Sequence, residues 1–349
     1  MNLERLDLLL AHARGKRVLV VGDFFLDKYL IIDQALAEVS LETGLEAHQV
    51  VETRASPGAA GTVTNNLAAL GVEALAVSVV GDDGEGFDLL RGLDATGVNV
   101  DGVVIRADRF TPTYTKPMLR VRGGAQRELN RLDIKNRGKL PVDAEERVIK
   151  ALRGLLPQVN AVIIADQVQE ADYGVVTERV RDELAVAAQT YAEIPFIADS
   201  RARIGLFQNL LIKPNAREAM LAIDREATWR GDPDPDWQVD REVIESAGER
   251  LYRRNGQPVF LTVGAHGILA FHEGGPTLIP AARHTGPIDI VGAGDAAIAG
   301  IAAALCAGAT AIEAAELGCL AAGVTVRQIG TTGAASRRQI LDLWREQRA

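Results

Sequence analysis

One stretch near the C-terminal end of the sequence, "DIVGAGDAAIAGIAAAL", joins a carboxylate to a turn that could bind an anion. Gly292, Ala293 and Gly294 have little side-chain bulk, and the Ala-rich run that begins near Asp295 is typical of a helix. A glycine turn at a helix start presents bare N–H groups at the positive end of the helix dipole. We therefore expect these three residues to form an anion site.

Asp295, in the first turn of this helix, allows two interpretations. It can act as a cap or as a partner of the helix dipole. Beside a bound phosphate, however, it would repel the ligand unless it accepted a proton from an attacking hydroxyl group. A third interpretation, the dinucleotide pattern G-x-G-x-x-A formed with Ala297, is the weakest, because no apolar strand leads directly into the turn.

Two further stretches could bind a nucleotide. In "KPNAREA", Asn215 and Glu218 have the spacing of a helix-capping box, and they could equally hold magnesium-bound water and phosphates. In "TVGAHG", Thr262, Gly264 and Gly267 follow a predicted strand, where glycines can form a hairpin turn or let a nucleotide approach the backbone. For each stretch both interpretations stay open.

Two N-terminal stretches could bind a hydroxylated ligand. Asp27 lies just past the first predicted strand, and Gly58, Ala59 and Thr62 belong to a small-residue turn that opens a helix. A turn followed by a capped helix explains this second stretch without any ligand. The alternative is a polar floor for a sugar, with Asp27 accepting hydrogen bonds from its hydroxyl groups.

Short apolar runs that end in Gly, Asp or Asn predict a mostly parallel sheet buried on both faces. The predicted strands are residues 17–23, 72–84, 160–166, 194–200, 210–215 and 258–264. Amphipathic helical patterns lie between most of them, at residues 62–70, 86–96, 143–156, 173–191 and 241–254. This alternation predicts helices on both faces, with ligands bound beyond the carboxyl ends of the strands. Those ends carry Asp23, Asp166, Asp199 and Asn215.

Two segments, residues 28–54 and 107–133, interrupt the alternation with β-type patterns that no helix follows at the usual distance. We expect them to leave the main sheet and to pair into a small accessory sheet. No Pro/Ser-rich linker, clear repeat or low-complexity tract divides the chain. We therefore expect residues 1–349 to form one domain with insertions.

The overall composition excludes several classes of protein. The 349 residues are 47% hydrophobic and 24% charged, which is typical of a globular chain, and the formal charge of −9 disfavours nucleic acid or an anionic membrane as the main partner. Cys306 and Cys319 lack a metal-type spacing and favour a reducing compartment. The charged N-terminus is unlike a signal peptide, and the apolar run 296–308 is too short to span a bilayer. We expect a cytoplasmic protein.

In this order, these motifs resemble the ribokinase-like (PfkB) family of carbohydrate kinases over nearly the whole chain, with "DIVGAGD" similar to the C-terminal signature of the family. The resemblance implies a three-layer α/β/α fold with a mostly parallel central sheet. Residues 28–54 and 107–133 would form a β lid that pairs two copies into a homodimer. Asp295 would be the general base, and the backbone of residues 292–294 would form the anion hole for the transferred phosphoryl group.

The same resemblance implies ATP and Mg²⁺ and leaves a requirement for a monovalent cation open. Asn215 and Glu218 would bind phosphate and, through water, magnesium. The remaining implied contacts are a nucleotide-binding turn at Thr262, Gly264 and Gly267 and an acceptor site at Asp27, Gly58, Ala59, Thr62 and Asp289.

Within the family, "VLVVGDFFLDKY", "NNLAALGV", "TPTYTKPMLR", "NRLD" and "AAGVTVRQIGT" are most similar to the kinase part of D-glycero-D-manno-heptose-7-phosphate 1-kinases. We expect no counterpart of the nucleotidyltransferase domain that is fused to some of those enzymes. Three departures concern the acceptor half and the signature. A Gly-Gly pair followed by Asn appears here as Gly58, Ala59 and Thr62, an Asp-Tyr-x-Lys-Gly segment appears as residues 166–170, "DQVQE", and the Thr of the signature is Ile290.

We therefore expect an intact phosphate-transfer half and an altered acceptor half. The function that follows is ATP-dependent phosphorylation of a sugar or sugar phosphate. Two alternatives stay open: a kinase for another sugar or a nucleoside, and a non-catalytic family member that binds sugar or nucleotide. A nicotinamide-dependent enzyme ranks last.

Overall fold

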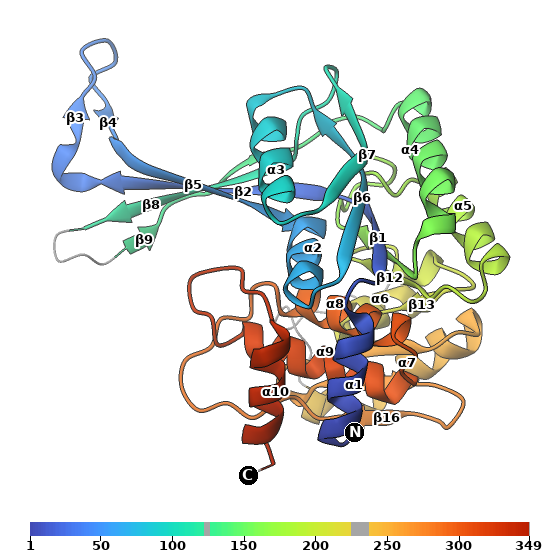
Figure 1. The fold of residues 1–349 in the computed structure, drawn as a ribbon. Helices are drawn as coiled ribbons and strands as arrows, with labels where there is room; N and C mark the ends of the chain where they lie inside the picture. Colours follow the sequence, from blue (N-terminus) through green and yellow to red (C-terminus); the bar gives the residue numbers. More distant parts are fainter. Residues whose placement is uncertain (122–125, 225–236, 349) are drawn as a thin grey trace.

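The structure is a computed structural model that describes residues 1–121, 126–224 and 237–348. A large sheet runs through the body of the molecule, with helices on both faces, and a second, narrow sheet projects from one side (Figure 1). The helices and the mostly parallel sheet confirm the predicted α/β/α class.

The main sheet has nine strands in the order β16-β15-β14-β13-β12-β11-β1-β6-β7. Neighbours from β14 to β7 are parallel, whereas β15 and β16 extend one edge in antiparallel pairing. The bounds of these strands are β1 (Arg17–Gly22), β6 (Glu73–Gly81), β7 (Asn99–Arg106), β11 (Ala161–Asp166), β12 (Phe196–Ser200), β13 (Leu211–Ile212), β14 (Val259–Thr262), β15 (Ile268–Phe271) and β16 (Thr277–Ile279).

Alternate side chains of the strands pack on opposite helical layers, as expected for a sheet buried on both faces. Val18 and Val20 of β1 face one layer, and Leu19 and Val21 face the other. The first layer contains α1 (Leu3–Ala13), α2 (Ala60–Ala69), α3 (Gly84–Ala95), α8 (Ala293–Cys306), α9 (Ala311–Thr325) and α10 (Arg337–Glu346). The second contains α4 (Val142–Leu155), α5 (Glu178–Thr190), α6 (Ala216–Ile223) and α7 (Trp237–Asn255).

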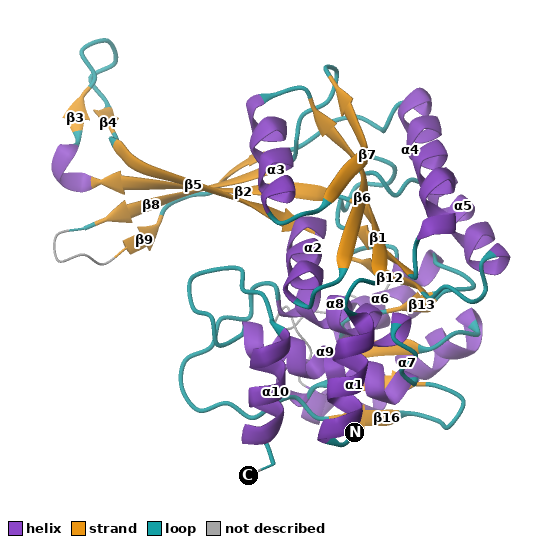
Figure 2. Cartoon of the chain, in the orientation of Figure 1, coloured by secondary structure: helices purple, strands orange, loops and turns teal. Residues whose placement is uncertain are grey.

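The accessory sheet confirms that both interrupting segments leave the main sheet and pair with each other (Figure 2). Its central strand β2 pairs antiparallel with β5 and parallel with β8. The bounds are β2 (Phe24–Asp33), β5 (Val50–Ala59), β8 (Thr113–Arg120), β9 (Gln126–Glu128) and β10 (Leu132–Ile134), with a separate tip hairpin of β3 (Glu38–Val39) and β4 (Glu46–Ala47). Residues 122–125 of the second segment lie outside the described residues. We call this sheet the lid.

The lid strands begin earlier and end later than the predicted segment 28–54. Only Asp23 separates β1 from β2, and the buried Phe24 and Leu26 continue the apolar run of the first strand. An apolar pattern cannot show where a chain passes from one sheet to the next when both parts are buried.

None of the described helices is long and apolar enough to cross a bilayer.

Candidate active site

The glycine turn opens α8 as predicted, and the helix begins at Ala293, two residues before the start expected from the Ala-rich run. Gly292 precedes it with φ 79° and ψ 0°, and a Cβ added there would lie 2.9 Å from Thr332 Cγ2 and 3.4 Å from Thr62 Cγ2. No side chain caps the helix. In the described part of the chain, the N–H groups of Gly294 and Asp295 have no hydrogen-bond partner, so they are available to an anion.

Asp295 is a half-buried carboxylate at this helix start. Burial, together with the negative charge of Asp199, raises the pKa of Asp295 to about 7, although Lys213 and Arg201 act in the opposite direction. A carboxylate with a pKa near 7 is basic enough to accept a proton and is still largely ionised slightly above neutral pH. The geometry therefore allows Asp295 to act as a base beside an anion site.

Lys213 is a cation beside Asp199, one of the carboxylates that act on Asp295. The side chain is buried, with 3% of the residue exposed, and its Nζ lies 3.2 Å from Asp199 Oδ2. Burial alone would lower the pKa of Lys213, but Asp199 and Glu218, followed by Asp295, raise it above the usual lysine value. Lys213 Nζ would also lie 3.7 Å from a Cβ added at Gly294. A charged lysine therefore faces the glycine turn.

The predicted capping box is present at the start of α6. Asn215 Oδ1 accepts a hydrogen bond from the Glu218 N–H at 2.8 Å, and Glu218 Oε2 accepts one from the Asn215 N–H, also at 2.8 Å. The capping interpretation of these two residues is thus confirmed, while their role toward magnesium stays a prediction. Burial, and then Asp199, raise the pKa of Glu218 to about 7.

The predicted nucleotide turn lies beside the capping box. Asn215 pairs with Thr262 in a parallel bridge, and the Thr262 N–H donates to Pro214 O at 2.9 Å. Gly264 and Gly267 have φ values of 56° and 110°, and a Cβ at Gly267 would lie 2.1 Å from Ile279 O. These glycines make the turn of the β14–β15 hairpin, as one interpretation predicted. The open space around the Gly264 Cβ position leaves room for a ligand.

Asp27 lies on β2, at the base of the lid. Its Oδ1 is 3.2 Å from Lys116 Nζ, and its charge contributes to the raised pKa of Asp295, so the two carboxylates lie in one region. A Cβ added at Gly58 on the neighbouring strand would lie 2.5 Å from Asp27 Oδ2, so a side chain there would displace the Asp27 carboxylate. The methyl group of Thr62 would lie 3.4 Å from a Cβ added at Gly292, so this predicted acceptor residue lies next to the glycine turn.

Asp289 has a structural task. Its Oδ1 accepts a hydrogen bond from the Val291 N–H at 3.0 Å, and its Oδ2 accepts one from the Gly330 N–H at 3.1 Å. The carboxylate thereby ties the approach to the glycine turn to the loop after α9. A contact between Asp289 and an acceptor stays a prediction.

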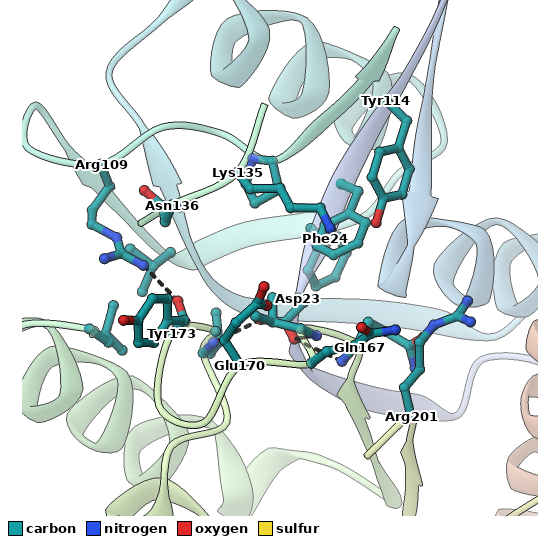
Figure 3. A pocket seen from close by; sticks show the side chains of 18 of the residues that line it. Asp23, Phe24, Arg109, Tyr114, Lys135, Asn136, Gln167, Glu170, Tyr173 and Arg201 are labelled. Carbon is teal, nitrogen blue, oxygen red and sulfur yellow. Dashed lines mark hydrogen bonds between the residues drawn. The ribbon is translucent and has the colours of Figure 1, made fainter. Parts of the chain in front are cut away.

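A cavity of about 270 Å³ lies between the base of the lid and residues 167–175, which follow β11 (Figure 3). Tyr114 and Arg131 line it from the lid side, and Gln167 and Tyr173 line it from the other side. Among the described residues, none of those predicted to bind the acceptor lies in its lining. Arg201 also lines it and lowers the pKa of Asp295, so the cavity adjoins the carboxylate cluster.

Residues 27–338 match the profile of the pfkB family carbohydrate kinases. The chain belongs to this family. The family assigns it to the sugar kinases.

Curated relatives and solved structures extend this result. The chain is 30% identical over 338 residues to the "Bifunctional protein HldE" of Geobacter sulfurreducens, covering 95% of this chain and 64% of that protein. It is 29% identical to the protein of the same name from Desulfatibacillum aliphaticivorans, covering 90% of this chain and 60% of that protein. The chain thus spans about three fifths of the length of these relatives.

Two solved structures share the fold of this pfkB kinase. Arabidopsis thaliana ribokinase, complexed with ribose and ATP, superposes with a TM-score of 0.65 at 18% identity, covering 94% of this chain and 98% of that one. Escherichia coli phosphofructokinase-2, in complex with potassium, gives a TM-score of 0.70 at 18% identity, covering 96% and 100%. Together with the layers described above, these similarities confirm the ribokinase-like fold.

The residues around Asp295 include three that the sequence motifs did not single out for a role there: Lys213, Asp199 and Arg201. Lys213 directly follows an apolar strand and precedes Pro-Asn, where a lysine is ordinarily a surface cation. Asp199 was noted only as a strand end. The sequence signal for a role of Lys213 in the site was its position directly between a predicted buried strand and the predicted ligand motif at Asn215.

Ala59, the last residue of β5 and the residue directly before α2, occupies a backbone conformation that favours glycine, with φ 52° and ψ −118°. We predict that Ala59→Gly raises the free energy of unfolding by about 1 kcal/mol, because relief of strain outweighs the added freedom of the unfolded chain. Ala68→Gly, within α2 and without such strain, should lower the free energy of unfolding by about 0.5–1 kcal/mol. Urea denaturation checks both variants, and a loss of stability in Ala59→Gly would contradict the strain.

Proposed function

We propose that this pfkB kinase transfers the γ-phosphoryl group of ATP to a hydroxyl group of a sugar or sugar phosphate. The observation that carries the proposal is a carboxylate with a raised pKa, Asp295, placed beside two unpartnered N–H groups at the start of α8. One helix end thus offers both an anion site and a proton acceptor.

In this proposal Asp295 takes the proton of the acceptor hydroxyl group as that oxygen attacks phosphorus. The N–H groups of Gly294 and Asp295 donate to the phosphoryl oxygens, where negative charge is present throughout the transfer. Lys213 lies close enough to the glycine turn to neutralise part of that charge. The lid excludes water, which otherwise competes with the acceptor.

Magnesium is expected with ATP, and the residues fit a water-mediated site better than a direct one. Within residues 1–121, 126–224 and 237–348, no group of three or more His, Cys, Asp or Glu residues could hold a metal ion. Mg²⁺ commonly keeps several waters and binds through one or two carboxylates together with phosphates. Asn215 and Glu218 would hold such water, and the bound ion would offset phosphate charge.

The acceptor is proposed to be a heptose 7-phosphate or a related sugar phosphate. Support comes from the similarity to the kinase part of the heptose-7-phosphate enzymes and from the cations Arg131, Lys135 and Arg201 in the cavity lining. The altered segment after Asp166 keeps another sugar or a nucleoside as the alternative. A non-catalytic binding protein would have no use for a base beside its phosphate site.

The lid is also proposed to pair two copies of the chain. Leu132 on the lid and Leu41 and Leu45 in the tip hairpin expose apolar side chains, with exposures of 61%, 104% and 70%. A second copy could cover this apolar surface.

Removal of the proposed base tests the function. Asp295→Asn should lower turnover roughly 10²–10⁴-fold, the usual contribution of a general base, and should leave nucleotide binding largely intact. The assay is ADP release with Mg-ATP against a panel of sugars, sugar phosphates and nucleosides, with nucleotide affinity measured by calorimetry. Asp94→Asn, on the exposed face of α3, is the control. Wild-type turnover in Asp295→Asn would contradict the assignment.

The pH dependence of turnover follows from the raised pKa of Asp295, which is about 7. Only the ionised carboxylate accepts a proton, so turnover should rise with pH through about 7 and level off above it. The logarithm of turnover should increase about one unit per pH unit below that value. The residual turnover of Asp295→Asn should lack this rise. A wild-type profile that is flat between pH 5 and 8 would contradict a base with this pKa.

A further inference from the structure

Residues 167–175, which we call the acceptor segment, line much of the cavity beneath the lid (Figure 3). The segment contains no regular helix or strand. Two charged side chains outside it, Asp23 and Arg203, satisfy several of its backbone groups.

Asp23 binds N–H groups at both ends of the acceptor segment. Its Oδ2 accepts hydrogen bonds from Gln167 N at 2.8 Å and Val168 N at 3.0 Å, and its Oδ1 accepts one from Val175 N at 2.7 Å. The residue is buried, with 3% exposed. The fit is close, because a Cβ added at Gly174 would lie 2.6 Å from Asp23 Oδ1. The carboxylate of Asp23 therefore holds the two ends of the acceptor segment close together.

Arg203 binds carbonyl groups of the same segment. Its Nη1 donates to Gln169 O at 2.9 Å, and its Nη2 donates to Val168 O. The guanidinium group is itself oriented by Asp166, with Nε 3.1 Å from Oδ2 and Nη2 2.5 Å from Oδ1. The carboxylate of Asp23 thus binds N–H donors of the acceptor segment, and the guanidinium group of Arg203 binds its carbonyl acceptors.

The hydrogen bonds of Asp23 and Arg203 hold the backbone that carries the cavity-lining side chains of the acceptor segment. With the backbone groups fixed, Gln167, Gln169, Glu170 and Tyr173 line the cavity. Gln167 Oε1 also accepts a hydrogen bond from Arg201 Nε at 2.9 Å. Because the charge of Arg201 acts on Asp295, the segment is connected to the region of the proposed base.

We propose that Asp23 and Arg203 are positioning residues that fix the acceptor segment and thereby set the affinity of the enzyme for its acceptor. The inference rests on the proposed function, since it assumes that the acceptor enters this cavity. The hydrogen bonds of both residues described above go to residues 166–175 and not to the glycine turn. They act through the backbone of the segment, so their removal affects acceptor binding more than the transfer step.

Asp23→Asn gives the sharpest test, because an amide NH₂ in place of either oxygen would face N–H donors. Charged hydrogen bonds of this kind support a rise of roughly 10–100-fold in KM for D-glycero-D-manno-heptose 7-phosphate. The KM for ATP and the turnover at saturating acceptor should change little. Hydrogen exchange should accelerate in residues 167–175, while the peptides of α8 and α9 stay protected.

Arg203→Gln provides a second variant should Asp23→Asn fold poorly, and it should show the same KM pattern. Its matched control is Arg5→Gln, which breaks a two-bond pair with Glu313 outside the cavity lining, at 2.7 and 3.0 Å. Arg203→Lys keeps the charge but loses the planar fork, so it should restore only part of the affinity.

The outcomes separate this inference from the function on which it rests. No turnover by the wild-type enzyme with this heptose phosphate, fructose 6-phosphate or any other panel member would overturn both. Turnover by the wild type, together with an unchanged acceptor KM in folded Asp23→Asn and Arg203→Gln, would overturn the positioning role alone. An equal rise in the KM values for ATP and acceptor would also overturn it, because that result indicates a general structural effect.

Discussion

The site depends on one buried cation held among carboxylates. Lys213 lies under the carboxyl edge of the sheet, where Asp199, Glu218 and Asp295 raise its pKa, and its positive charge in turn limits the rise in the pKa of Glu218 and Asp295. The positive charge of Lys213 offsets part of the effect that burial and Asp199 have on the pKa of these two carboxyl groups. The charge of Lys213 thus favours the ionised form of Asp295, which is the form that can act as a base.

The parallel sheet brings these groups together from distant parts of the chain. Asp199 lies in the last two residues of β12, Lys213 directly follows β13, and Asp295 lies in the first turn of α8. The lid joins at β1, which β11 separates from β12, and only Asp23 lies between β1 and β2. In the proposed function, the phosphate-binding groups lie near the ends of β12 and β13, and the acceptor cavity lies near the ends of β1 and β11.

The sequence predicts the parts of the site that are local. Gly292 and Asn215 belong to short motifs whose turn and capping geometry depend on their neighbours alone, and both geometries are present. The lid sheet was also predicted from its β-type pattern. By contrast, Asp23 contacts residues 144 to 152 positions away, through the pairing of β1 with β11, and no local pattern shows such a contact. Because the Val175 N–H donates to Asp23, residues near 175 are held outside the helix, and α5 begins at Glu178, later than the predicted residue 173.

The central claim is that the glycine turn and Asp295 transfer phosphoryl to a sugar hydroxyl group rather than bind ligands passively. The most direct measurement is ³¹P NMR of the purified chain with Mg-ATP and D-glycero-D-manno-heptose 7-phosphate. The account predicts ADP and one new phosphate ester appearing in equal amounts, with the 7-phosphate signal retained. ADP accompanied only by inorganic phosphate, or ATP that binds and stays intact with every acceptor supplied, would contradict it.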